Sequence, residues 1–130
     1  MCYLFSGDIT LIKNIMFKDT NTLDLKQSKR PHLLLADYQM MDDKAFLLKL
    51  STTVGKGNEK YFFKLVPNHL NRLKKVSYVD LRYVVEKSCR NNGHIGTVPE
   101  YTLKKIHNQL DKVQSELQEE SYLRYKQHKR

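Results

Sequence analysis

The chain has 130 residues, of which 40% are hydrophobic, so we expect a single domain over residues 1–130 with one ordinary core. Its formal net charge of +9 indicates a partner that carries phosphates or carboxylates, either a nucleic acid, an acidic protein or a membrane surface. The two cysteines are far apart and show no CxxC or Cys/His spacing, and no apolar run approaches the length of a membrane span. These features argue against a disulfide framework, a metal site and a membrane anchor, and favour a cytoplasmic protein.

The first part of the chain predicts two strands separated by a long loop. Apolar residues alternate over residues 9–12 after a Gly-Asp turn, which is typical of a strand. Residues 14–27 are mostly polar and predict a loop, and a loop of this length is usually functional or flexible. A nearly continuous apolar run predicts a buried strand over residues 32–38, and Pro31 in front of it keeps Arg30 out of a helical backbone.

The middle of the chain predicts further short strands. We expect strands over residues 45–50 and 61–66, with a glycine-containing hairpin or loop over residues 55–58 between them. Residues 68–75 are short and polar and have room for one helical turn. Residues 76–85 are rich in Val and Tyr and predict one strand, or two with a bend.

The last part of the chain predicts a loop and a long helix. Asparagines and glycines predict a loop over residues 89–96, and residues 97–100 match a capping box. We expect the helix to cover about residues 98–120 and residues 121–130 to fray. Its apolar stripe consists of Leu103, Ile106, Leu110, Val113 and Leu117.

The order of elements is five or six strands and then one helix, without alternation of strands and helices. We therefore predict a mainly β protein with a C-terminal helix, built as a small SH3-like, half-open barrel of five to seven strands.

Arg30 is the first candidate for chemistry, because it lies where a polar loop meets a buried strand. A guanidinium held there can grip a phosphate through two oxygens and stabilise a pentavalent transition state. The alternative is a solvated cation at the start of a strand. Ser51, Thr52 and Thr53 have the same two interpretations, because three hydroxyls at a strand end can bind phosphate oxygens or simply terminate the strand.

Several short motifs follow one another in a set order along the chain. They are Gly7-Asp8-Ile9, Lys29-Arg30-Pro31-His32-Leu33-Leu34-Leu35, Ser51-Thr52, Ser77-Tyr78-Val79-Asp80-Leu81, Glu86-Lys87-Ser88 and Ile95-Gly96-Thr97-Val98, followed by the terminal helix. This order resembles that of the MazF/PemK family of toxin endoribonucleases. The resemblance runs from about residue 7 to about residue 117. It implies a MazF/CcdB-type barrel, a homodimer, cleavage of single-stranded RNA and neutralisation by a cognate antitoxin.

The resemblance also implies roles for individual residues. Arg30 takes the place of the catalytic arginine, and Ser51 or Thr52 takes that of the catalytic threonine. The implied reaction needs no metal or cofactor and leaves a 2′,3′-cyclic phosphate and a 5′-hydroxyl. For the general base, His32 is one candidate, and Asp19 and Asp24 in the long loop are others.

If the chain cleaves RNA, the basic residues are expected to line a path for its phosphates, with aromatic side chains stacking on its bases. The candidates for RNA binding are Phe17, Lys18, Lys26, Lys29, His32, Thr53, Lys56, Tyr61, Arg72, Lys74, Lys75 and Arg82. The competing interpretation is that most of these lysines are ordinary surface residues.

Three alternatives to this function remain open. A ToxN-like type III toxin has the same fold and is inhibited by a repeat RNA rather than by a protein. A non-catalytic barrel can bind nucleic acid without cutting it. A toxin of this fold can also bind a protein target such as a topoisomerase, as relatives of CcdB do.

Overall fold

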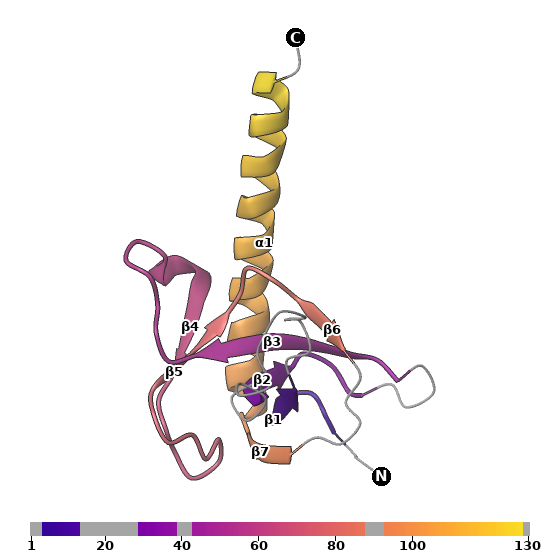
Figure 1. Cartoon of the computed structure of the whole chain (residues 1–130), viewed down its shortest axis with the longest axis vertical. Coiled ribbons are helices and arrows are strands. Elements are labelled where there is room, and N and C mark those ends of the chain that lie inside the picture. Colours follow the sequence, from indigo (N-terminus) through magenta and orange to yellow (C-terminus); the bar gives the residue numbers. More distant parts are fainter. Residues whose placement is uncertain (1–3, 14–28, 39–42, 88–92, 129–130) are drawn as a thin grey trace, which may run out of the picture.

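The computed structural model describes residues 4–13, 29–38, 43–87 and 93–128 and consists of an antiparallel sheet with one long helix packed across it (Figure 1). The sheet has seven strands, which confirms the prediction of a mainly β fold with a C-terminal helix. The strands are β1 (Asp8–Lys13), β2 (Lys29–Leu34), β3 (Ala45–Ser51), β4 (Phe62–Leu65), β5 (Ser77–Asp80), β6 (Val85–Lys87) and β7 (Gly93–Thr97), with a 3₁₀ helix η2 (Glu59–Tyr61) and an α-helix α1 (Glu100–His128). No helix in the described ranges is long and apolar enough to cross a membrane.

Strand β3 is the centre of the sheet. The strands follow the order β4-β5-β3-β2-β1-β7, and β6 also pairs with β3. Both β5 and β6 run antiparallel to β3, with Leu50 opposite Val79 and Leu47 opposite Val85. Residues 76–85, which predict one strand or two with a bend, therefore contribute to two strands, β5 and β6, and each of them pairs with a different part of β3.

Alternation along the strands divides the core into two clusters on opposite faces of the sheet. Leu33 of β2 packs with Leu48 and Leu50 of β3 and with the apolar stripe of α1. Leu34, the next residue of β2, packs instead with Leu47 and other residues in a second cluster. We call the face covered by α1 the helix face and the opposite one the distal face.

The bounds of β2 differ from the predicted strand over residues 32–38. The strand covers Lys29–Leu34, so Pro31 and Arg30 lie inside it rather than in front of it. Proline is tolerated at this position because β2 pairs with β3 only from His32 onward, so the missing amide donor has no partner on β3 to lose.

The predicted loop over residues 89–96 is wrong in its second part, where Gly93–Thr97 form β7 and pair with β1. Residues 89–92 lie outside the described ranges. Glycine at position 96 indicates close backbone packing rather than a turn, because a Cβ there would lie 2.3 Å from the carbonyl oxygen of Asn71.

The predicted capping box is also wrong. Thr97 ends β7, and its hydroxyl donates to the carbonyl of Gly7 at 3.3 Å. The helix begins at Glu100, and the carbonyl of Pro99 accepts from the amide of Leu103 at 2.9 Å. α1 continues to His128, beyond the expected end near residue 120, because no glycine or proline interrupts it. Its C-terminal part extends past the sheet (Figure 1).

The segment expected to hold one helical turn, residues 68–75, is a turn built on asparagine side chains. Asn71 is 2% exposed, and its side-chain oxygen accepts from the amides of Asn68 and Leu73. Its side-chain amide donates to the carbonyl of Val66 at 2.9 Å. These bonds satisfy a buried polar group and hold the turn against Gly96.

Candidate functional site

The strand registers bring four polar residues into one row on the distal face. Ser51 of β3 lies opposite Tyr78 of β5, and Tyr78 lies opposite Lys64 of β4. The pairing of β2 with β3 ends at His32 and Lys49, and Arg30 and Ser51, each two residues further along its own strand, point to the same face as that pair. Facing residues of an antiparallel pair point to the same face. We call Arg30, Ser51, Tyr78 and Lys64 the distal row.

Two lysines lie on the same face as the distal row. Lys49 is two residues before Ser51 on β3, and Lys87 of β6 lies opposite Ala45. Neither ammonium group forms an ion pair with a carboxylate in the part of the chain that the structure describes. Burial lowers the pKa of Lys87, and the positive charge of Lys49 lowers it further. Two half-buried cations that repel each other are stabilised by a bound anion.

His32 lies among these cations and is only 3% exposed. Its Nδ1 contacts the main-chain carbonyl oxygen of Arg30 at 2.9 Å, and because a carbonyl only accepts, Nδ1 carries the proton. Burial, together with the charges of Lys87, Lys49 and Arg30, lowers the pKa of His32 to about 4, against the effect of this hydrogen bond, which raises it. The ring is therefore neutral at pH 7, and its hydrogen bond holds the main chain of Arg30 in place.

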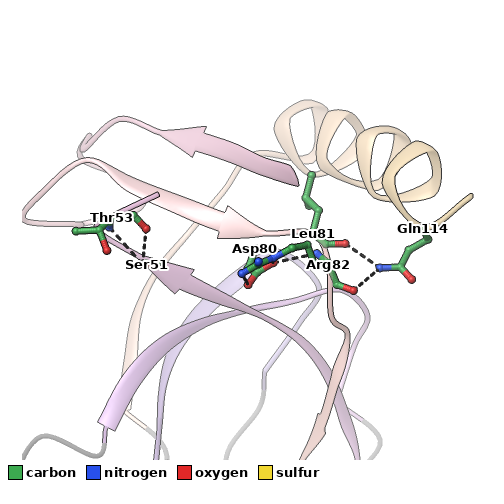
Figure 2. A network of polar contacts seen from close by, with 6 residues as sticks. All are labelled: Ser51, Thr53, Asp80, Leu81, Arg82 and Gln114. Atoms are coloured by element: carbon green, nitrogen blue, oxygen red, sulfur yellow. Dashed lines mark hydrogen bonds and ion pairs between the residues drawn. The ribbon is translucent and has the colours of Figure 1, made fainter. Parts of the chain in front are cut away.

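The hydroxyl groups of Ser51, Thr52 and Thr53 at the end of β3 differ in their partners, and Figure 2 draws the contacts between Ser51 and Thr53. The Oγ of Ser51 donates to the carbonyl of Thr53 at 2.8 Å and accepts from the amide of Thr53 at 3.2 Å. This local turn uses the only proton of the Ser51 hydroxyl. Thr52 and Thr53 are exposed, and their hydroxyls make no hydrogen bond to the described residues. Thr52 is therefore the better placed donor to an incoming phosphate.

A pocket of about 570 Å³ adjoins the end of the distal row. It is lined by Thr52, Thr53, Val54, Glu59, Phe62, Lys64 and Tyr78. Its walls thus combine two aromatic rings, three hydroxyls, one cation and one carboxylate. Such a mixture suits a planar ligand with polar edges.

Arg82, a predicted RNA-binding residue, is engaged by its own neighbour. Its Nε and terminal nitrogen donate to the carboxylate of Asp80 at 3.1 and 3.0 Å (Figure 2). The guanidinium also lies 5.0 Å from the ring of Phe62. The main-chain carbonyls of Arg82 and Leu81 both accept from the side-chain amide of Gln114 on α1. These contacts fasten the β5–β6 connection to the helix.

Among the other predicted RNA-binding residues, His32 lies on the distal face and Thr53 lines the adjoining pocket, whereas the rest do not gather at the distal row. Tyr61 packs against the core of the helix face, where Lys60 lies 4.9 Å from its ring. Lys56 is exposed in the loop before η2, and the exposed cations Arg72, Lys74 and Lys75 belong to the segment before β5. Phe17, Lys18, Asp19, Asp24 and Lys26 lie outside the described residues, as does the side chain of Lys29.

Sequence reasoning missed Lys49, Lys87, Tyr78 and Lys64. Period-two alternation was the available signal for Lys49, because it occupies the same parity as Ser51 in a strand whose other parity is apolar. For the other three residues the signal depends on strand register, which the sequence alone does not supply.

The sequence matches no protein-family model and no curated protein. Solved structures do match the fold. The crystal structure of MazF (Form-I) from Deinococcus radiodurans superimposes with a TM-score of 0.62 at 15% identity, covering 87% of this chain and 97% of that chain. The MazE-MazF crystal structure (Form-II) from the same organism gives a TM-score of 0.61 at 15% identity, covering 87% and 96% of the two chains. The chain therefore has the MazF fold.

Proposed function

We propose that this chain is the toxin of a toxin–antitoxin system and a metal-independent endoribonuclease that cleaves single-stranded RNA. One observation carries the proposal: Arg30 and Ser51 share the distal face with Lys49 and Lys87, and no carboxylate of the described residues pairs with these cations. A polyanion that crosses the face would meet a guanidinium, two ammonium groups and the hydroxyls that follow β3. The MazF fold supports the same conclusion.

The chemistry follows from what these groups can stabilise. The 2′-hydroxyl of a ribose attacks the adjacent phosphorus, and the bond from phosphorus to the 5′-oxygen breaks. The proton of the 2′-hydroxyl passes to solvent, and the departing oxygen takes one from solvent, which leaves a 2′,3′-cyclic phosphate and a 5′-hydroxyl. Arg30 donates to the equatorial oxygens of the phosphorane, and the hydroxyl of Thr52 or Ser51 holds one of them.

His32 supports this step as a positioning residue. Its depressed pKa of about 4 and its burial make it a poor proton acceptor at pH 7. Its hydrogen bond to the carbonyl of Arg30 instead fixes the strand from which the guanidinium projects.

We infer the kind of partner from the complexes that share the fold. The MazE-MazF structures contain a second protein, and by analogy this toxin would be neutralised by a protein antitoxin. We also propose that the chain acts in the cytoplasm as a homodimer. Co-expression with any small reading frame encoded beside the gene, followed by co-purification, tests the antitoxin.

The decisive experiment is cleavage of a mixed single-stranded RNA in EDTA, with both new ends mapped. We expect cuts with cyclic phosphate ends, lost by at least 100-fold in Arg30→Ala and partly retained in Arg30→Lys. Arg124→Ala, which removes an exposed arginine near the end of α1, is the matched control and should cut normally. Intact RNA with the wild-type protein, or cutting undiminished in Arg30→Ala, would refute the proposal.

A further inference from the structure

We propose that the pocket beside the distal row binds a guanine base of the RNA, and that Glu59 is the residue that recognises it. The inference deepens the proposed ribonuclease function and rests on it for the identity of the polymer. It adds a base-binding subsite, which would decide where along an RNA the protein acts.

The pocket is continuous with the groups assigned to the phosphate. Thr52, which directly follows Ser51, forms part of its wall, and so do Tyr78 and Lys64 of the distal row. A nucleotide whose phosphate lies between Arg30 and the hydroxyls that follow β3 would therefore have its base beside Tyr78. Bases of single-stranded RNA are commonly splayed out and stacked on such rings.

The carboxylate of Glu59 is unexpected on a basic surface meant for RNA. It forms no ion pair with the described residues, although Lys64 lines the same pocket and Lys60 is adjacent in sequence. Lys60 instead binds Glu116 of α1 at 2.7 Å. An unneutralised carboxylate repels phosphate, so Glu59 is useful at this site only toward a group that donates hydrogen bonds.

Guanine is the base that best matches a carboxylate. Its Watson–Crick edge presents two neighbouring donors, N1–H and the 2-amino group, which fit the two oxygens of one carboxylate. Adenine, cytosine and uracil each present one donor on that edge. The O6 of guanine is an acceptor, and the ammonium of Lys64 and the hydroxyl of Thr53 are donors in the same pocket.

The test measures binding, so it does not depend on cleavage. The probe is a short, dye-labelled oligouridylate that carries 2′-methoxy groups and has one central base changed to guanine or to hypoxanthine. Hypoxanthine lacks only the 2-amino group. We expect the wild-type protein to bind the guanine probe at least about 5-fold more tightly than the hypoxanthine probe, as for a good bidentate contact. In Glu59→Gln this preference should disappear, and Glu119→Gln, an exposed carboxylate on α1, should keep it.

The outcomes separate this inference from the proposed function. Equal binding of the two probes by the wild-type protein, or an unchanged preference in Glu59→Gln, would overturn the guanine subsite even if RNA is cleaved. A guanine preference that depends on Glu59 would support the subsite even if the protein does not cleave RNA, and the ribonuclease proposal would then fail alone. Glu59 is exposed, so Glu59→Gln should fold, and circular dichroism verifies this.

Discussion

His32 donates a hydrogen bond from Nδ1 to the main-chain carbonyl of Arg30 at 2.9 Å, so a buried neutral imidazole holds the backbone of an exposed guanidinium. The two side chains lie on the same face of β2 and are surrounded by further cations. Protonation of His32 would add a charge where Lys49 and Lys87 already repel it. The fold should therefore be sensitive to pH through this one residue.

The first prediction concerns this pH dependence. The pKa of His32 is about 4 in the folded protein and 6.5 in the unfolded chain, so below pH 6.5 the unfolded chain binds a proton that the folded protein does not. The free energy of unfolding should fall by about 2 kcal/mol between pH 7 and pH 5 through this group. Urea unfolding at both pH values checks it.

A pair of variants isolates the effect from other groups. His32→Asn should lose this part of the pH dependence, whereas His69→Asn, which removes an exposed histidine, should retain it. The same pH slope in His32→Asn and in the wild-type protein would contradict a buried, neutral His32.

The second prediction separates the roles of the hydroxyls of Ser51 and Thr52 at the end of β3. Thr52→Val should lower kcat by about 100-fold, because it removes a donor to the transition state. Ser51→Ala should retain most activity and lower the free energy of unfolding by about 1 kcal/mol, because it removes the turn with Thr53. Single-turnover cleavage and urea unfolding of both variants give the answer, and the reverse pattern would assign the catalytic hydroxyl to Ser51.

The third prediction assigns phosphate contacts to Lys49 and Lys87. Replacing each lysine by glutamine should reduce the slope of log Kd against log salt concentration for single-stranded RNA by about 0.7. Lys105→Gln and Lys112→Gln, exposed on α1, provide controls with the same change of charge. Equal losses in the two pairs would indicate a diffuse effect of net charge rather than contacts on the distal face.

The fourth prediction tests the close approach at Gly96. Gly96→Ala places a methyl group 2.3 Å from the carbonyl oxygen of Asn71. It should lower the free energy of unfolding by about 3 kcal/mol. In Gly93→Ala the new Cβ would meet only the side chain of Leu11 at 3.8 Å, so this variant should cost much less. The urea midpoints of the two variants measure this difference. Similar midpoints would mean that the turn at Asn71 can move away from residue 96 at little cost in free energy.

Much of the fold is predictable because it depends on local patterns. Alternation predicts β1, β-propensity predicts β3, and the apolar stripe predicts α1. The errors fall where a residue type had two uses. Gly93 and Gly96 predict a loop but lie in β7, where Gly96 allows close packing. Thr97 predicts a helix cap, but its hydroxyl donates to the carbonyl of Gly7.

The sequence alone determined a chain of short strands with a terminal helix, and it singled out Arg30 and the hydroxyls of Ser51 and Thr52, because burial pattern and neighbouring proline are local properties. Only the tertiary structure decided what faces Arg30. The registers of β3, β5 and β4 align Ser51 with Tyr78 and Lys64. The helix η2 places Glu59 in the wall of the pocket beside them. Register is a relation between distant segments, and a shift of one residue would turn each of these side chains to the other face.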